Sequence, residues 1–350
     1  MNARGSVVTA IARAPVTKPV VKPDGHRWWP WFKRGLALTF FALVLALLLR
    51  QMHHLAWAEV WQGLQALPAP VLLTAAGLAL ASHLLYACFD LLGRHYARHN
   101  LATPTVMAIT FVSYAFNLSM GSLIGGVGFR YRLYARFGLG TARTTRIITM
   151  SMLTNWLGYL LLAGLMFTLF PPTLPAHWEV DAATLPITGA VMLALPIAYL
   201  LWCAASRRRS WTLRGHLVDV PTLRLALLQM AMSCANWLIM AGVVYVLLRQ
   251  HIEFPVVLGT LLVGAVAGVL AHVPAGLGVL EAVFVALLSD YAPAPTLVAA
   301  VLAYRALYYL VPLIIAGAVY VLLEARAKQL PARAHHPLRV EKYSRPQIGN

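Results

Sequence analysis

An arginine and a glutamate interrupt apolar stretches near the C-terminal end of the chain. Arg305 is the ninth residue of the apolar run 297–323, and Glu281 stands in the apolar stretch before it. If these runs cross a membrane, a charge near the bilayer centre costs at least about 2.5 to 3.5 kcal/mol, so each side chain needs a partner. One interpretation is a structural ion pair between Glu281 and Arg305. The other is that Arg305 binds an anionic phosphate group while Glu281 competes for the guanidinium, and both can hold in turn.

Glycine pairs interrupt two apolar stretches, 105–128 and 256–288. Each pair has the form Gly-x-Gly: Gly126 and Gly128 in the first stretch, Gly276 and Gly278 in the second. Glycine does not hold a straight helix, so we expect each stretch to turn back on itself as a helical hairpin. Such turns direct the unpaired N–H groups of helix N-termini toward the middle, where a phosphate could bind. The alternative is that the glycines only allow two helices to pack closely.

Three arginines follow the first glycine pair within one short segment: Arg130, Arg132 and Arg136. Arg132 and Arg136 are four residues apart and share a helical face, which suits either anionic head groups or simple anchoring at the cytoplasmic surface. Arg130 is nearest the glycines, so we expect it to lie deepest and to contact a phosphate.

The remaining polar residues of the apolar stretches are expected to be structural. Asp90 is predicted to pair with Arg94 one helical turn on. Asn117 and Asn155 are predicted to join helices through hydrogen bonds and to support the phosphate site. His83 is interpreted as a hydrogen-bonded packing residue.

The composition excludes two broad classes of protein. Of the 350 residues, 60% are hydrophobic and 11% charged, and the mean hydropathy is +0.71. These values exclude a soluble enzyme. The formal net charge is +17, but this apolar chain lacks the polar surface that a nucleic-acid-binding protein would have. The excess of basic residues is therefore assigned to loops, and no nucleic-acid partner is expected.

No catalytic, cofactor-binding or metal-binding motif is found in the sequence. The three cysteines lie in apolar runs and form neither a disulfide framework nor a CxxC site. A P-loop, a G-x-S-x-G elbow and a Ser-His-Asp order are absent from the sequence. We therefore expect no enzyme, no cofactor and no metal site.

Length and hydropathy predict an all-α polytopic membrane protein. A helix needs about 20 apolar residues to cross the bilayer core. Six runs qualify as spans, namely 35–49, 71–92, 147–170, 185–205, 225–248 and 297–323. The two glycine-broken stretches are predicted to be re-entrant hairpins that enter and leave on one face, and the alternative is eight simple spans.

The basic residues decide between these topologies. Five segments (1–34, 93–100, 126–146, 206–224 and 326–350) hold 25 of the 28 Lys and Arg residues. Only the model with two re-entrant hairpins places all five in the cytoplasm, as the positive-inside rule requires. Both termini are then cytoplasmic, and the two halves become an inverted repeat.

The same reasoning divides the chain into three parts. Residues 1–26 have the composition of a disordered basic segment, and residues 326–350 form a basic tail. Between them, residues 27–325 are predicted to form a single membrane domain with halves at about 27–170 and 185–325.

Six ordered segments resemble the lysylphosphatidylglycerol synthase transmembrane-region family, and in particular its small inner-membrane members of the YbhN type. They are Tyr86–Leu92, Ser113–Leu118, Gly125–Tyr134, Thr154–Tyr159, Pro274–Ala282 and Tyr304–Tyr309. The resemblance extends over residues 27–328 and implies a multi-pass protein of the bacterial inner membrane. Larger members use this region to move aminoacylated phosphatidylglycerol between leaflets and carry a separate aminoacyltransferase domain. Synthase activity is not expected here, because the chain stops soon after Leu323.

The expected function is passive or ion-coupled translocation of an anionic phospholipid, such as cardiolipin or phosphatidylglycerol, through a polar groove between the halves. The expected head-group site comprises Arg130, Arg305, Gly126, Gly128, Gly276 and Gly278, with support from Glu281, Asn117, Asn155, Arg132 and Arg136. Two alternatives stay open, namely a secondary transporter of a small anion and a scaffold for a phospholipid-synthesis enzyme. Membrane phospholipids, and in the scaffold case that enzyme, are the expected partners.

Overall fold

The computed structural model describes residues 57–171, 184–206, 210–213, 216–271, 273 and 276–329. All of them belong to one compact unit that extends from residue 51 onward. The secondary structure is helical, as predicted, apart from one antiparallel β-hairpin that pairs Ser210 with Asp219 and Leu213 with His216. The predicted first span, 35–49, and most of the predicted basic tail lie outside the described residues.

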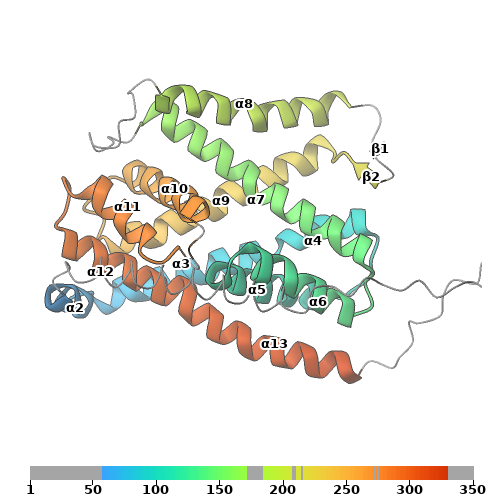
Figure 1. The fold of residues 1–350 in the computed structure, drawn as a ribbon, viewed down its shortest axis with the longest axis horizontal. Coiled ribbons are helices and arrows are strands. Elements are labelled where there is room, and N and C mark those ends of the chain that lie inside the picture. Colours follow the sequence, from blue (N-terminus) through green and yellow to red (C-terminus); the bar gives the residue numbers. More distant parts are fainter. Residues whose placement is uncertain are drawn as a thin grey trace, which may run out of the picture. The chain divides into compact units, whose positions relative to one another are not determined.

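The helices follow one another with short connections (Figure 1). In the first part of the chain they are α2 (Trp57–Gln65), α3 (Ala69–Ala87), α4 (Phe89–Ala97), α5 (Thr103–Met120), the π-helix η1 (Ser122–Gly128), α6 (Phe129–Arg136) and α7 (Thr141–Leu169). In the second part they are α8 (Thr184–Ala205), α9 (Leu223–Leu247), α10 (Phe254–Ala271), α11 (Val279–Leu288), α12 (Ala294–Arg305), the π-helix η4 (Ala306–Leu310) and α13 (Val311–Gln329). Strands β1 (Ser210–Leu213) and β2 (His216–Asp219) lie between α8 and α9.

Within the described residues, six helical segments are long and apolar enough to cross a membrane. They are Ala69–Arg94, Thr141–Leu169, Thr184–Ala205, Leu223–Leu247, Phe254–Ala271 and Ala294–Gln329. Five of these coincide with spans predicted from the sequence. The sixth, Phe254–Ala271, is the first arm of the second predicted hairpin, and its 18 residues reach about 27 Å.

Both glycine-broken stretches fold as helical hairpins. After α5 the chain turns at Gly121 and returns through η1 and α6, which pack against α5. After α10 it returns through α11, which packs against α10. With 10 residues, α11 is about 15 Å long, half the thickness of a bilayer core. The structure therefore has two pairs of packed helical arms, while their re-entrant course in a membrane and the inverted repeat stay predictions.

Glycines bring the backbones of neighbouring elements together at two contacts. A Cβ atom on Gly125 would lie 2.2 Å from the backbone nitrogen of Asn117, so only glycine lets η1 lie this close to α5. On α7, a Cβ atom on Gly158 would lie 2.3 Å from the Ser233 hydroxyl of α9. These contacts position the segments that carry the polar residues described below.

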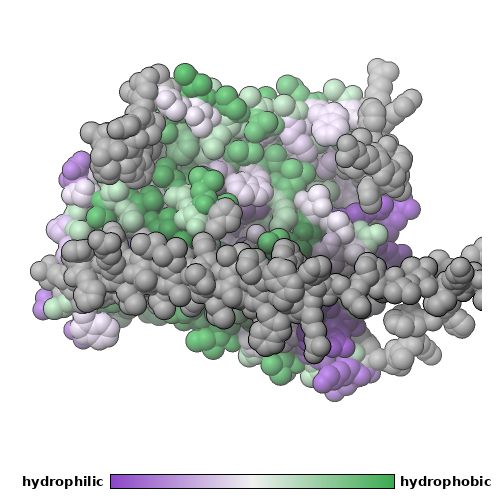
Figure 2. All heavy atoms as spheres, viewed as in Figure 1, coloured by the Kyte–Doolittle hydropathy of each residue, from purple (hydrophilic) through white to green (hydrophobic). Residues whose placement is uncertain are grey.

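Apolar side chains cover much of the surface that faces away from the core. Figure 2 shows hydrophobic residues over most of the visible face that is not grey, and the strongest hydrophilic colours near the end of α13. Exposed apolar side chains lie on α8 (Ile187, Val191, Leu201) and on α13 (Ile314, Leu322). A soluble protein rarely exposes this much contiguous apolar surface, whereas lipid tails would cover it.

The basic segments gather toward one end of this unit. In Figure 1, the end of α4, α6, the β-hairpin and the end of α13 lie toward the same end. The facing ends of α7 and α8, which flank the segment 171–184 without Lys or Arg, lie toward the opposite end. This is the distribution that the positive-inside rule requires of a multi-pass protein.

Candidate functional site

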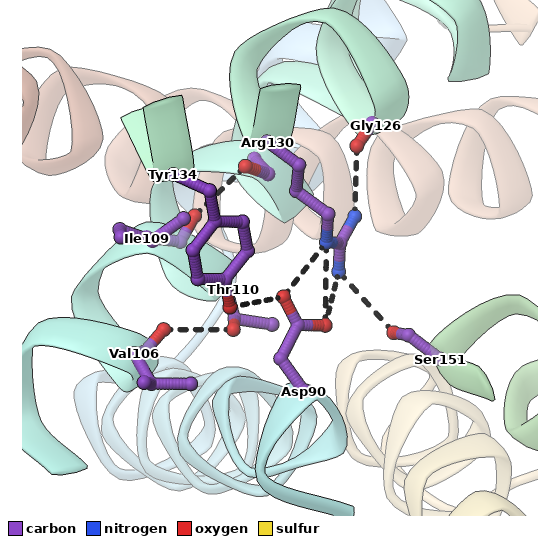
Figure 3. Close-up of polar contacts among 9 residues, drawn as sticks. Asp90, Val106, Ile109, Thr110, Gly126, Arg130, Tyr134 and Ser151 are labelled. Carbon is purple, nitrogen blue, oxygen red and sulfur yellow. Dashed lines mark hydrogen bonds and ion pairs between the residues drawn. The ribbon is translucent and has the colours of Figure 1, made fainter. Parts of the chain in front are cut away.

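A buried arginine joins the first hairpin to its neighbours (Figure 3). Arg130 of α6 donates from Nε to the carboxylate of Asp90 on α4 at 3.0 Å, and from Nη2 to the same carboxylate at 3.1 Å. Tyr134, one turn further along α6, donates its hydroxyl proton to Asp90 at 2.9 Å. The side chains of Arg130 and Asp90 are 3% and 0% exposed, so this is a fully buried, bidentate ion pair.

The two other contacts of Arg130 reach the π-helix η1 and α7. Nη1 donates to the carbonyl oxygen of Gly126 at 2.9 Å, and Nη2 donates to the Ser151 hydroxyl at 3.3 Å. Every nitrogen of the guanidinium therefore has a protein partner. The side chain is also only 3% exposed, so protein groups shield the guanidinium from an incoming phosphate.

The predicted partner of Asp90 is wrong. Arg94 does not bind Asp90; it donates to the Thr103 hydroxyl at 3.0 Å. Asp90 pairs instead with Arg130, which is 40 residues away in the sequence. The reason is that α6 brings the buried guanidinium of Arg130 to the buried face of α4, where it binds both oxygens of the Asp90 carboxylate. Arg94 is partly exposed and makes no such contact.

A second arginine–carboxylate pair lies at the second hairpin, as one of the two sequence interpretations predicts. Arg305, the last residue of α12, donates from Nε and Nη2 to the carboxylate of Glu281 on α11, the latter at 3.0 Å. Nη2 also donates to the carbonyl oxygen of Gly276 at 2.7 Å. The ring of Tyr309 lies 5.5 Å from the guanidinium carbon, within cation–π range.

The two pairs share three features. Each arginine donates to a carboxylate and to the carbonyl of a hairpin glycine, Gly126 within η1 or Gly276 at the turn after α10. Each also lies next to a π-helical segment, with η1 shortly before Arg130 and η4 directly after Arg305. Segments of π-helix inside helical runs occur frequently at functional sites. The pairs differ in exposure, because the side chains of Arg305 and Glu281 are 8% and 14% exposed.

The remaining glycines have backbone roles. Gly276 and Gly278 have φ angles of +56° and +77°, which favour glycine at the turn between α10 and α11. Gly128 caps the start of α6 with an ordinary helical φ of −60°. A Cβ atom on Gly126 would lie 2.9 Å from the side-chain oxygen of Asn117, so this asparagine of α5 packs against η1.

The other predicted site residues lie apart from these pairs. Arg132 and Arg136 are half exposed and share Glu324 of α13, at 2.8 Å and 3.3 Å. Asn155 joins α7 to α9 through its backbone carbonyl, which accepts hydrogen bonds from Ser233 and Trp237. The structure thus places Arg130 and Arg305 in two separate pairs, Arg132 and Arg136 in a surface cluster, and Asn155 at the contact between α7 and α9.

The sequence interpretation missed several polar residues. Asp90, Ser151 and Tyr134 complete the Arg130 site. An acidic residue inside an apolar run was the available signal for Asp90, since such a charge requires a partner. Within the described residues, no group of three side chains suited to hold a metal ion occurs.

Comparisons with known proteins agree with this picture. Residues 35–316 match the family model described as the lysylphosphatidylglycerol synthase TM region. The chain is similar to the inner membrane protein YbhN of Escherichia coli, with 45% identity over 309 residues that cover 88% of this chain and 97% of the relative. An uncharacterized protein of Synechocystis is 30% identical over 282 residues, which cover 80% and 87% of the two chains. A phosphatidylglycerol lysyltransferase of Staphylococcus haemolyticus is 23% identical over 287 residues, which cover 80% of this chain but 32% of that enzyme.

Proposed function

Because this chain belongs to the lysylphosphatidylglycerol synthase transmembrane-region family, we propose that it moves an anionic phospholipid between the leaflets of the bacterial inner membrane. The location follows from its similarity to an inner membrane protein and from its six membrane-length helices. The similarity to a phosphatidylglycerol lysyltransferase favours phosphatidylglycerol, or the related cardiolipin, as the lipid. The transport is passive or ion-coupled.

The proposed topology has two re-entrant hairpins and cytoplasmic termini. The short returning arms α6 and α11 and the gathering of basic segments toward one end support it. Where the backbone turns within a membrane, its N–H and C=O groups must form hydrogen bonds with other protein groups or face a water-filled cavity. The arginine contacts to Gly126 and Gly276 satisfy one carbonyl in η1 and one at the turn after α10. The two halves then surround a polar path for the head group, while the acyl tails stay in the bilayer.

The observation that carries the proposal is the pair of Arg305 and Glu281. Arg305 lies inside the apolar helical run Ala294–Gln329 and Glu281 in α11, just after the turn of the second hairpin, and the pair is less deeply buried than the pair at Arg130. A guanidinium binds a phosphate with the same two-pronged geometry that it uses for a carboxylate. In the proposed cycle a lipid phosphate replaces Glu281 at Arg305, and Glu281 takes the guanidinium back when the lipid leaves.

The test compares Arg305→Leu with the double variant Glu281→Leu, Arg305→Leu in purified protein reconstituted into liposomes with labelled phosphatidylglycerol. Arg305→Leu strands a carboxylate and is expected to destabilise the fold, whereas the double variant removes both charges and should stay folded. Loss of charged hydrogen bonds worth about 1.5 to 3 kcal/mol predicts lipid movement slower by about 10- to 100-fold in the double variant. Arg326→Leu, the same change at an exposed position of α13, is the matched control.

A folded double variant that moves lipid at the parent rate would refute the phosphate role of Arg305 and leave a structural pair. Uptake of a small anion without lipid movement would favour the secondary transporter. A scaffold would move neither, and its cellular function would survive the loss of Arg305 and of Arg130.

A further inference from the structure

A chain of hydroxyl groups runs through the middle of the helices. The hydroxyls of Tyr114 and Tyr308 lie 2.9 Å apart, and that of Tyr308 lies 2.6 Å from the Ser82 hydroxyl. Ser82 donates to the side-chain oxygen of Asn236 at 2.8 Å. All four side chains are buried, and they come from α5, η4, α3 and α9. The chain therefore links four elements that lie far apart in the sequence.

An imidazole with one unused nitrogen lies against this chain. His83 is 2% exposed, and its Nδ1 lies 2.9 Å from the carbonyl oxygen of Ala79, to which it donates. The proton is thereby placed on Nδ1, so Nε2 carries a bare lone pair, and within the described residues Nε2 has no hydrogen-bond partner. A buried acceptor left open in this way calls for an explanation.

Three aromatic rings lie close to the imidazole ring of His83. The ring centroids of Tyr308, Tyr114 and Phe111 lie 4.7, 5.2 and 5.9 Å from that of His83. The faces of aromatic rings attract cations, so this surrounding suits an imidazolium ion as well as a neutral imidazole.

His83 and the hydroxyl chain lie where a transporter would bind a coupling ion. His83 lies 14 residues from the start and 11 from the end of the membrane-length segment Ala69–Arg94. Asn236 lies 13 and 11 residues from the ends of Leu223–Leu247. The bonds from Ser82 to Asn236 and from Tyr114 to Tyr308 cross between the two predicted halves of the chain. Coupling-ion sites of transporters built from inverted repeats lie near mid-membrane at this kind of junction.

A short aromatic path connects the cluster to the pair at Arg305. The rings of Tyr308 and Tyr309 lie 6.0 Å apart, and Tyr309 contacts the Arg305 guanidinium. A charge gained at His83 is thus close in structure to the proposed phosphate site. In a low-dielectric interior a buried cation and a buried anion are each costly alone and less costly together.

We infer that His83 binds a proton and couples lipid movement to proton movement, an inference that rests on the proposed function. The proton adds to the Nε2 lone pair, Nδ1–H stays on Ala79, and a neutral ring becomes a cation. No bond to carbon forms or breaks. The proton is taken up from the side on which the anionic head group enters the polar path. Proton and head group both leave on the opposite side, and His83 returns to its neutral form.

Among His83 and the groups that face it, the imidazole is the one that takes up the proton. Tyr114 faces it from α5 and Tyr308 from η4, while α9 contributes the uncharged Asn236 through Ser82. On α4, two helical turns along, Asp90 is held by Arg130. Among the described residues, no carboxylate or guanidinium is bonded to His83.

The direct test follows the protonation of His83 by 15N-histidine NMR of the full-length protein in lipid nanodiscs. The His83 signals are assigned by their loss in His83→Gln, whose amide N–H replaces the bond to Ala79, with exposed His251→Gln as the matched control. We expect the resonances to change from the Nδ1–H form to the doubly protonated form as the pH falls. A single neutral form throughout the pH range in which the protein stays folded would overturn the inference. This measurement needs no lipid transport.

The second test imposes a pH gradient on liposomes that contain labelled phosphatidylglycerol. For one proton per lipid, a gradient of about one pH unit biases the lipid between leaflets by up to about tenfold. The wild type and His251→Gln should show this bias, and His83→Gln should not. Tyr308→Phe, which keeps the ring and removes the hydroxyl that links Ser82 to Tyr114, should weaken it. Lipid movement by the wild type without any bias overturns the coupling but keeps the proposed function, whereas absence of lipid movement with and without a gradient refutes the proposed function itself.

Discussion

At the scale of single residues, charge burial decides where the polar groups lie. Asp90 and Arg130 are almost completely inaccessible, and each satisfies the other with help from Tyr134, Gly126 and Ser151. Removal of one partner of such a pair leaves an uncompensated buried charge, while removal of both leaves only an apolar contact to repack. The arrangement is therefore sensitive to single substitutions and tolerant of paired ones.

The first prediction concerns this pair. Arg130→Met should lower the free energy of unfolding by about 3 to 5 kcal/mol, because it strands Asp90. Adding Asp90→Asn should recover much of that loss, since the amide matches the carboxylate in shape without the charge. Unfolding of the purified variants in detergent measures both effects. Additive losses from the two substitutions would show that the pair is not coupled.

The second prediction concerns His99, which follows α4 outside the membrane-length segments. Burial lowers the pKa of His99 below its ordinary value of 6.5, and the charges of Arg94 and Arg143 lower it further. The folded protein then holds His99 neutral, while the unfolded chain takes up a proton near pH 6.5. The contribution of His99 to stability is present above that pH and is lost as the pH falls toward its folded pKa.

Melting temperatures in detergent between pH 8 and pH 5 test this sign. The wild type should lose more stability on acidification than His99→Gln, whose side chain does not titrate. His251→Gln, at an exposed position, should follow the wild type. An identical pH profile for all three proteins would contradict the prediction.

At the scale of elements, the length of each apolar run determines where a helix forms, and small residues determine how closely neighbouring helices pack. The hairpin of α5, η1 and α6 depends on Gly125, where a side chain would meet the backbone of Phe116 and Asn117 at 2.2 Å. These atoms belong to the backbone of α5 and cannot shift as a flexible side chain would, so η1 must move away from α5 if a methyl group is added at Gly125. That movement would also shift Arg130, which follows η1 directly in α6.

The third prediction is that Gly125→Ala lowers the stability by about 1 to 3 kcal/mol through overpacking. Gly77→Ala is the matched control, because nothing lies within 4 Å of a Cβ atom at that helical position. It should leave the stability unchanged or raise it by up to about 1 kcal/mol. Thermal unfolding in detergent compares the two, and equal stabilities would disprove the close contact.

At the scale of the whole molecule, the distribution of charge predicts the orientation. Segments 126–146 and 206–224 should share the cytoplasmic face, because this places the basic segments on one side. Single cysteines at Thr141 and Ser210, in a protein whose Cys88, Cys203 and Cys234 are replaced, should stay unlabelled by an impermeant thiol reagent in intact cells. Labelling at either site would rule out the model with two re-entrant hairpins. A cysteine in the segment 171–184 should label and serves as the positive control.

The sequence by itself predicted the membrane class and five of the described spans, and it offered the pairing of Glu281 with Arg305 as one of two interpretations. These follow from local composition, because a bilayer demands about 20 apolar residues per helix and makes an unpaired charge costly. For Glu281 and Arg305, the hairpin turn shortly before Glu281 limited the choice of partner.

Only the tertiary structure decided the partner of Asp90 and the chain of hydroxyls beside His83. Arg130 is 40 residues from Asp90, and Tyr308 is 226 residues from Ser82. Spacing within a helix favoured Arg94 for Asp90, because the sequence shows only neighbours along one helix. Buried polar groups select their partners from whichever helices pack against them, and that packing depends on close contacts such as those at Gly125 and Gly158, which bring together surfaces from distant parts of the chain.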